Sequence, residues 1–232
     1  MKVLAVVPAY NEEQSIVKVI DNLNEFAPDV DILIVNDGSS DNTLEICKEN
    51  PYCKVIDMPF NVGLSYAVQA GLRFASIHDY DFALQFDGDG QHRAEYIEDL
   101  LEQSKKGYDI VIGSRFLSVK RHKSIRMVGS AIIAFVMRLT SGIRITDPTS
   151  GMRLFNKKLL HEFAINMNYD PEPDTLAYLA RGGVKICEIQ VEMNEREFGV
   201  SYFTFAKSIG YMLRMSFSML IVQWFRKRGT IK

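Results

Sequence analysis

The feature that most limits the fold of this chain is the alternation, across its first half, of short apolar runs with segments of helical periodicity. Short apolar runs suit strands that are buried on both faces, and apolar residues repeated every three or four positions suit amphipathic helices. Alternation of this kind predicts a mostly parallel α/β sheet flanked by helices. The expected strands are 2–7, 31–35, 54–58, 82–86, 109–112 and 185–192, and the expected helices are 12–26, 42–49, 64–77, 94–105, 128–139, 159–165 and 174–181.

Composition sets further bounds. The 232 residues, 47% hydrophobic and 24% charged, suit one globular domain with a full core, and a net charge of −2 gives no reason to expect a nucleic acid partner. Cys47, Cys53 and Cys187 are odd in number and form no CxxC pair, which is typical of reduced thiols in a cytosolic protein. The first apolar run ends at Pro8, and no stretch of about 20 apolar residues follows, so neither a signal peptide nor a membrane-spanning helix is expected.

An acidic motif follows the expected strand 82–86. Ligands of parallel sheets bind beyond the carboxyl ends of the strands, so this is where we expect the chemistry. Asp87 and Asp89, separated by Gly88, offer the hard oxygen ligands that Mg²⁺ or Mn²⁺ prefers, and Gln91 and His92 are close enough to add another. A solvated acidic turn is the alternative for this motif taken by itself.

Two further polar clusters follow strands 2–7 and 31–35. Asp37 can accept hydrogen bonds from a ribose or a base, and an ordinary strand–turn–helix connection explains Gly38 but not Asp37. Tyr10 offers a face on which a nucleobase can stack, and Glu12 is either a polar contact or a favourable acid near a helix start. No GxGxxG or GxxxxGK[ST] motif occurs, which disfavours a dinucleotide oxidoreductase and a P-loop kinase.

Taken in order, the clusters 8–12, 36–43, 61–63, 87–91 and 113–115 resemble those of the inverting family 2 glycosyltransferases with the GT-A fold, a Rossmann-like architecture. Within that family the similarity is greatest to dolichyl-phosphate mannose synthases and polyprenyl-phosphate glycosyltransferases. It continues through residues 147–153 and 188–201 and covers about residues 2–205.

The resemblance implies a role for each matching residue. In the donor site, Asp37 holds the nucleoside, Pro8, Tyr10 and Glu12 surround the base, and Arg196 contacts the donor phosphate. Asp87, Gly88, Asp89 and Gln91 organise the Mg²⁺ or Mn²⁺ ion and the diphosphate. On the acceptor side, the residues that grip a lipid phosphate are Arg115, Arg126 and Ser130.

The sequence departs from the family pattern at a few positions. Asn36 stands where Asp is common, Arg93 where Pro is common, and Tyr202 where Lys is common. These departures bear on the identity of donor and acceptor rather than on the reaction class. The two-helix membrane anchor of several relatives is absent or shortened in this sequence.

Three carboxylates are candidates for catalysis on the acceptor. A phosphate acceptor is already an anion and needs no base, whereas a sugar hydroxyl needs one. Glu172 or Asp174 is the expected base for a saccharide acceptor, and Asp147 is expected to shape the acceptor pocket. The competing interpretation of residues 171–174 is a rigid helix start with Asp174 as its cap.

The last part of the chain differs in composition from the rest. We therefore divide the sequence into a GT-A catalytic domain, residues 1–205, and an amphipathic helical segment, residues 206–232. This segment carries Trp224 and ends in a basic run at 226–228, which favours binding at a membrane surface; packing as a core helix or in a homodimer are the alternatives. A second basic run, 115–126, fits either a lid over an anionic substrate or a solvated loop.

These observations predict a cytoplasmic glycosyltransferase, peripheral at the inner face of a membrane. Its donor is a nucleotide-diphosphate sugar, and its acceptor is either a polyprenyl phosphate or a lipid-linked or cell-surface saccharide, as in cell-wall assembly. A nucleotidyltransferase is disfavoured because no glycine-rich basic loop follows the first strand. A non-catalytic nucleotide-sugar sensor or scaffold remains the alternative, against which the intact Asp87 and Asp89 pair argues.

Overall fold

The computed structural model of the chain describes residues 1–119, 125–165, 171–195, 205–222 and 225, with side chains at 125, 126 and 205–209 left undescribed. Its centre is a sheet of seven strands in the order β3-β2-β1-β4-β6-β5-β7. All neighbours are parallel except β6, which is antiparallel to both β4 and β5. The strands are β1 (Val3–Ala9), β2 (Val30–Asn36), β3 (Cys53–Asp57), β4 (Phe82–Gln85), β5 (Ile110–Ser114), β6 (Arg153–Asn156) and β7 (Ile186–Gln190).

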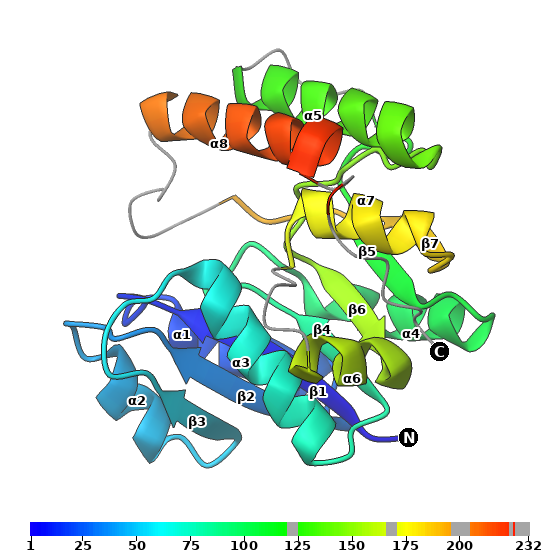
Figure 1. Cartoon of the computed structure of the whole chain (residues 1–232). Coiled ribbons are helices and arrows are strands. Elements are labelled where there is room, and N and C mark those ends of the chain that lie inside the picture. The colour runs from blue at the N-terminus through cyan, green and yellow to red at the C-terminus, as the bar shows by residue number, and fades with distance from the viewer. Residues whose placement is uncertain (120–124, 166–170, 196–204, 223–224, 226–232) are drawn as a thin grey trace.

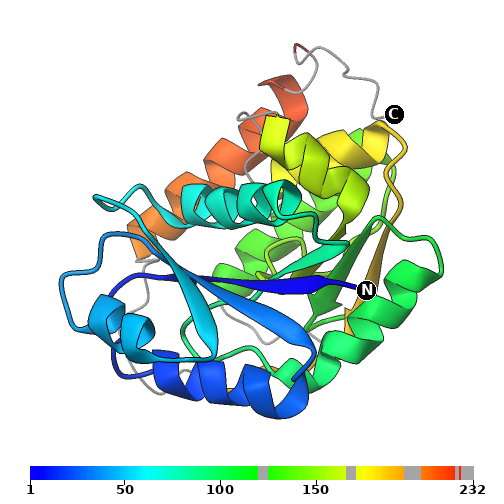
Figure 2. The ribbon, with the colours of Figure 1, turned by 90° about the horizontal axis from the view of Figure 1, so that it is seen from below.

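Helices cover both faces of the sheet. One face carries α1, α2 and α4, and the other carries α3, α6 and α7, as the view from below shows (Figure 2). The long helix α5 lies beside α8 in an outer layer above α7 (Figure 1). The helices are α1 (Ile16–Phe26), α2 (Thr43–Glu49), α3 (Leu64–Ile77), η1 (Ala94–Tyr96), α4 (Ile97–Lys105), α5 (Ile125–Ser141), α6 (Lys157–Ile165), α7 (Pro173–Arg181), α8 (Phe205–Phe217) and the short π-helix η2 (Ser218–Val222).

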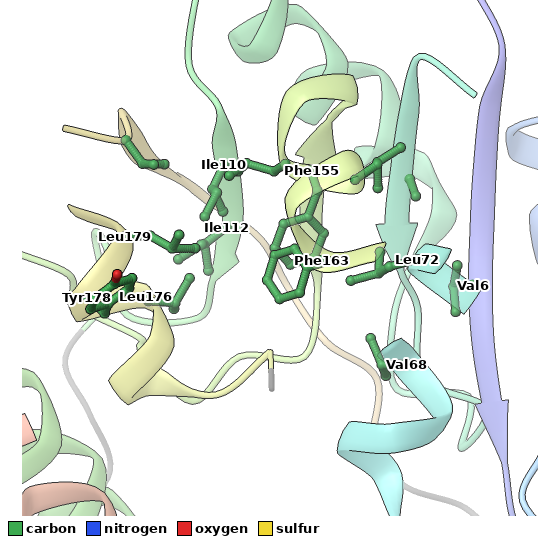
Figure 3. Packing of buried hydrophobic residues seen from close by; sticks show 14 of the residues in the cluster. Val6, Val68, Leu72, Ile110, Ile112, Phe155, Phe163, Leu176, Tyr178 and Leu179 are labelled. Carbon is green, nitrogen blue, oxygen red and sulfur yellow. The ribbon is translucent and has the colours of Figure 1, made fainter. Parts of the chain in front are cut away.

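Each face of the sheet has its own apolar cluster. Alternate residues of a strand point to opposite faces, so Leu4 and Val6 belong to one cluster while Ala5 and Val7 belong to the other. Phe155 and Phe163 lie in the middle of the larger cluster with their ring centroids 5.3 Å apart (Figure 3). This cluster extends outward to α5, α8 and η2, so a single core joins the sheet to the outer layer.

The expected α/β architecture is confirmed, with local corrections. The strand β6 was not predicted, because its four residues are too few to show an alternation and its first residue is Arg153. β1 continues past Pro8 to Ala9. β4 pairs only with Val3–Val6, so no neighbour on that side needs the N–H that proline lacks. α1 begins at Ile16 rather than at residue 12, after a turn in which Asn11 has a φ of 57°.

The contact between α3 and β1 depends on Gly71. A Cβ atom at this position would lie 2.1 Å from Cγ1 of Val6, inside the core. We expect Gly71→Ala to lower the free energy of unfolding by about 1–3 kcal/mol, because the helix or the strand must move outward. Chemical denaturation of the purified protein measures the change.

Gly210, in the middle of α8, is the matched control for Gly71. A Cβ atom there would meet nothing within 4 Å, so Gly210→Ala should raise the free energy of unfolding by about 0.5–1 kcal/mol. Equal effects of the two substitutions would show that the close approach of α3 to β1 is wrong.

The outer layer of α5 and α8 is buried on one side only. Met215 and Met219 are buried, and Gly129 of α5 leaves the space that the side chain of Met212 fills. Other large apolar side chains of the same layer are exposed, and in α5 and α8 they are spaced three or four residues apart, on one side of each helix. They are Val128, Ile132, Phe135 and Leu139 of α5, and Leu213, Phe217, Leu220, Ile221 and Val222 of α8 and η2. Within the described residues, no helix combines the length and the apolar character needed to cross a bilayer.

Candidate active site

The acidic motif lies where the sequence predicts it, in the turn that follows β4. The backbone N–H of Asp87 donates to Nδ1 of His92 at 2.8 Å, and Nε2 of Gln85 donates to Oδ1 of Asp87 at 3.2 Å. A Cβ atom on Gly88 would lie 2.9 Å from the Pro8 carbonyl oxygen, so only glycine lets this turn pack against β1. The three contacts fix the Asp87 carboxylate at the carboxyl edge of the sheet.

His92 supports this turn from beneath. Its ring is buried, and the ring edge contacts Phe86 with centroids 5.3 Å apart. Because Nδ1 accepts the N–H of Asp87, the proton of the neutral ring is on Nε2, which lies 3.6 Å from Oδ2 of Asp87. His92 is thus placed to hold the turn rather than to ligate a metal ion through Nδ1.

The other two expected metal ligands lie in the same turn. Asp89 accepts the N–H of Gln91 at 3.1 Å, and Nε2 of Gln91 donates to the carbonyl of Asn194 at 3.4 Å. The amide oxygen of Gln91 is therefore the atom that could face a cation. The described residues contain no group of three or more His, Cys, Asp or Glu side chains arranged to hold a metal. Asp87 and Asp89 alone suit an ion such as Mg²⁺, which takes one or two protein carboxylates and completes its shell with phosphate and water.

Asp37 is buried at the end of β2 and holds a neighbouring loop. Its two oxygens accept the backbone N–H groups of Val62 and Gly63 at 2.8 and 2.9 Å. A Cβ atom on Gly38, which has a φ of 66°, would lie 2.6 Å from the backbone of Phe60. Asp37 therefore anchors the loop that precedes α3, and only its remaining lone pairs can face a nucleoside.

A second set of hydrogen bonds ties the loop after β1 to the loop after β2. Oδ1 of Asn11 accepts the N–H of Ser40 at 2.8 Å, and the Asn11 N–H donates to the Ser39 hydroxyl at 3.0 Å. Glu12 accepts the hydroxyl of Ser15 at 2.7 Å, while Tyr10 stays 45% exposed at the rim. Pro8, near the end of β1, and Tyr10 and Glu12, in the loop that follows it, thus lie in one short segment next to Asp37.

On the other side of the acidic turn, the partly exposed Arg115 forms an ion pair with the buried Asp147. The guanidinium Nε and Nη2 lie 2.7 and 2.9 Å from the two carboxylate oxygens, and Asp147 is fully buried. Burial by itself would lower the pKa of Arg115, but the hydrogen bond and the negative charge of Asp147 outweigh it, so the pKa is raised. The guanidinium therefore stays charged beside Asp87, whose carboxylate it also attracts.

The loop that carries Asp147 is itself held from two sides. The carboxylate of Glu188 accepts the N–H groups of Thr146 and Asp147 at 2.6 and 2.8 Å. The hydroxyl of Thr149 contacts both Asp147, at 3.2 Å, and Ser130 of α5, at 3.3 Å. The expected acceptor residues Arg115 and Ser130 are thus brought to one loop.

The two expected bases, Glu172 and Asp174, are both hydrogen-bonded to other helices. Glu172 accepts the hydroxyls of Ser65 and Tyr211, at 2.8 and 2.5 Å. Asp174 is buried and accepts the hydroxyl of Ser218 at 2.6 Å. Burial, followed by the charge and hydrogen bond of Glu172, raises the pKa of Tyr211 well above its ordinary value, so Tyr211 remains a donor to Glu172.

Two expected site residues cannot be placed in this arrangement. Arg196 lies outside the described residues, and Arg126 lies in the first turn of α5 with an undescribed side chain. Their roles remain predictions.

Sequence reasoning missed several residues that shape the site. A Cβ atom on Gly151 would lie 2.3 Å from Oδ2 of Asp87, so the loop before β6 packs directly on the acidic motif. The turn-forming residues at 147–151 indicate a loop. They do not indicate that this loop contacts the turn at Asp87, which lies more than 60 positions earlier in the sequence. Tyr211 and Ser218 carried no signal, because their partners lie on other elements.

The fold and the site together define a class of protein: an α/β sheet with a two-carboxylate motif at a strand end, a hydrogen-bonded pair of loops on one side of that motif and a partly buried arginine on the other. Solved structures agree. Glucosyl-3-phosphoglycerate synthase from Mycobacterium tuberculosis aligns with a TM-score of 0.69 at 19% identity, covering 96% of this chain and 79% of that one. Another structure of that enzyme, with a TM-score of 0.64, contains Mn²⁺, UDP and glucosyl-3-phosphoglycerate. The fold is that of GT-A glycosyltransferases.

The sequence comparisons narrow this class to one family. Residues 4–163 match the model of glycosyl transferase family 2. The undecaprenyl-phosphate mannosyltransferase of Micrococcus luteus is 31% identical over 87% of this chain and 87% of its own length. The UDP-N-acetylglucosamine–dolichyl-phosphate N-acetylglucosaminyltransferase of Methanococcus voltae is 32% identical over 84% of this chain and 87% of its own. The chain belongs to glycosyl transferase family 2.

Proposed function

We propose that this protein transfers a sugar from a nucleotide-diphosphate sugar to a polyprenyl phosphate, with inversion at the anomeric carbon. The observation that carries the proposal is the ion pair between Arg115 and the buried Asp147, which lies close enough to the acidic turn for the charge of Asp87 to act on Arg115. A cationic group next to a two-carboxylate metal motif suits two anions, the donor diphosphate and an acceptor phosphate. The relatives named for undecaprenyl and dolichyl phosphate support this choice of acceptor.

The donor half of the site is the loop pair after β1 and β2. Tyr10 presents an exposed ring for the base, and the rigid hydrogen-bonded loops around Asp37 place the nucleoside. Pre-formed binding loops of this kind fix the orientation of the anomeric carbon toward the acceptor. Arg196 is proposed to contact the donor phosphate.

A divalent ion, Mg²⁺ or Mn²⁺, is proposed to bind through Asp87 and Asp89, with the amide oxygen of Gln91 as a further ligand. When bound, it would offset the negative charge that develops on the leaving diphosphate. The chain's own contribution is to hold Asp87 in place through His92, Gly88 and Gly151, and Asp89 through the backbone N–H of Gln91.

The state of the candidate bases favours a phosphate acceptor over a saccharide. Both oxygens of Glu172 and one oxygen of Asp174 accept hydroxyl hydrogen bonds from other elements of the fold, so in this geometry both side chains are engaged in contacts within the protein. A phosphate acceptor is already ionised and needs no base. Arg115, Arg126 and Ser130 are proposed to hold it, with Asp147 keeping Arg115 in position.

A panel of UDP-, GDP- and dTDP-sugars with Mn²⁺ or Mg²⁺ tests this function. Nucleotide diphosphate release that requires the metal and polyprenyl phosphate, and that Asp89→Ala abolishes, is the expected result. Release that responds to a saccharide instead of the lipid phosphate would contradict the acceptor. The absence of both release and binding for every donor would leave the scaffold role as the better account.

We further propose that the exposed face of α5 and α8 lies on the membrane surface, making the enzyme peripheral at the inner face. Phe135, Leu139, Leu213 and Phe217 are each between 58% and 67% exposed on this face. Apolar side chains gathered on one side of two adjacent helices are typical of binding in the headgroup layer. This position would bring the lipid phosphate toward Ser130 of α5 and the Asp147 loop that contacts it.

The double substitution Phe135→Glu and Phe217→Glu is expected to weaken binding to vesicles by about tenfold or more, because each change removes a large apolar side chain from the interface. Co-sedimentation with vesicles of phosphatidylglycerol and phosphatidylethanolamine measures the effect.

Ile77→Glu, on an equally exposed apolar side chain at the end of α3, is the matched control and should bind as the wild type does. A wild-type dimer in solution that the double substitution splits, without any vesicle binding, would instead identify this face as a homodimer interface.

A further inference from the structure

Arg153 is a buried cation that none of the roles described so far uses. It is the first residue of β6, at the carboxyl edge of the parallel strands, and only 3% of it is exposed. It faces Gln85 of β4 across the antiparallel ladder. Gln85 in turn donates to Asp87, so Arg153 is paired with the residue that contacts the acidic turn.

Its two terminal nitrogens contact two different loops. Nη1 donates to the carbonyl of Pro171, and Nη2 donates to the carbonyl of Pro148 at 2.8 Å. Pro171 immediately precedes Glu172, and Pro148 immediately follows Asp147. One guanidinium therefore joins the two loops that carry candidate acceptor-side carboxylates. Its third nitrogen, Nε, has no hydrogen-bond partner among the described residues.

If Arg153 served only to pack the core, its burial would cost more free energy than an apolar side chain in the same place. Burial lowers the pKa of Arg153, and the negative charges of Glu172, Asp147 and Asp87 only partly oppose that effect. A buried cation whose direct partners are neutral carbonyls loses much of its hydration without a full ionic bond in return. An apolar side chain of similar size would fill the position without that penalty, so the guanidinium contributes something other than packing.

We propose that Arg153 is a positioning residue for sugar transfer, which fixes the spacing of the Asp147 and Glu172 loops and thereby the walls of the acceptor pocket. The proposal rests on the proposed transferase function. It concerns the acceptor side because the Asp147 loop contacts both Arg115 and Ser130, whereas the Glu172 loop also accepts the hydroxyl of Ser65 at the start of α3. Arg153 acts through Asp147, which holds Arg115, and does not itself touch the reacting atoms.

Arginine suits this role for a geometric reason. Its planar fork presents two N–H directions at once and can reach two carbonyls on separate loops. The ammonium group of a lysine is a point charge at the end of a flexible stem and would reach one carbonyl well. Arg153→Lys should therefore keep the positive charge but lose the link between the two loops, whereas Arg153→Met loses both the charge and the link.

The first test does not depend on activity. Amide hydrogen exchange in residues 144–152 and 171–176 is expected to accelerate about tenfold in both variants, because each loop loses its link to the other. Exchange in β1 and β2 should not change. Arg73→Met, which removes an exposed arginine from α3, is the matched control and should leave both acceptor-side loops protected.

The second test is kinetic and uses the donor found in the panel with polyprenyl phosphate. We expect kcat to fall about 100-fold in Arg153→Met and about tenfold in Arg153→Lys, with the donor KM within about threefold of the wild-type value. If Arg153→Met fails to fold, Arg153→Lys decides the result through the same measurements.

The outcomes separate the two proposals. If the wild-type protein turns over no donor, the proposed transferase function is contradicted, and the exchange data still test whether Arg153 links the two loops. If the wild type is active and Arg153→Lys matches it in both exchange and kcat, the positioning role is overturned. A donor KM that rises as steeply as kcat falls would also overturn it, because the effect would then not be confined to the acceptor side.

Discussion

Replacing Asp87 with asparagine is expected to lower kcat for sugar transfer by about 1,000-fold while leaving the fold intact. Asparagine has nearly the same shape as aspartate, so it fits the close contact with Gly151. That contact is so close that a Cβ atom added to Gly151 would lie 2.3 Å from Oδ2 of Asp87. It removes the negative charge with which Asp87 would hold a divalent ion against the donor diphosphate. Rates at saturating Mn²⁺ and thermal denaturation of both proteins measure the two parts of the prediction.

Asp99→Asn, on the exposed side of α4, is the control and should retain the wild-type rate. The decisive observation is the metal titration. If Asp87→Asn reaches the wild-type kcat when more Mn²⁺ is added, the carboxylate contributes only affinity for the ion. If it reaches that rate with no added metal, the proposed metal site is wrong.

The second large effect concerns the ion pair between Arg115 and the buried Asp147, whose two substitutions should lower the stability by different amounts. Arg115→Met leaves the fully buried Asp147 carboxylate with the Thr149 hydroxyl and one backbone N–H, and we expect it to cost about 3–5 kcal/mol of unfolding free energy. Asp147→Asn leaves Arg115, whose side chain is 32% exposed and can turn toward water, so about 1–2 kcal/mol is expected. Urea denaturation at neutral pH measures both changes.

A double variant separates pairing from burial. Arg115→Met combined with Asp147→Leu removes both charges and should recover most of the stability lost in Arg115→Met. It should not recover transfer to polyprenyl phosphate, because the proposed phosphate contact is gone. Equal losses for the two single substitutions would show that the pair is solvated in solution.

The parts of the fold that sequence patterns predicted are those with strong local signals. Strands β1 to β5 and the helices between them follow from apolar runs and periodicity, and the position of Asp87 at a strand end follows from the strand itself. β6 was missed because four residues carry no period. Its place between β4 and β5 is set by pairing with strands about 70 and 40 positions earlier.

The candidate site divides along the same line. The residue types of the acidic turn predict a metal-binding motif. Nothing in the sequence near Asp37 predicts that its carboxylate accepts the backbone N–H groups of Val62 and Gly63. The sequence also does not predict the hydrogen bonds of Glu172 with Tyr211 and of Asp174 with Ser218, because the partners are 39 and 44 positions apart. Hydrogen bonds between distant elements depend on the packed fold, which no short window of sequence contains.

The reversed direction of β6 has a consequence for how such an enzyme can diversify. The loops after β1, β2 and β3 leave the sheet at its carboxyl edge, whereas the loop at 142–152 enters the sheet there. The loops proposed to face the donor therefore run out of the sheet, whereas one part of the wall proposed to face the acceptor, the loop at 142–152, runs into it. Insertions or exchanges between α5 and β6 could remodel which lipid or sugar is accepted while the nucleotide half is inherited unchanged, so the two specificities can drift apart independently.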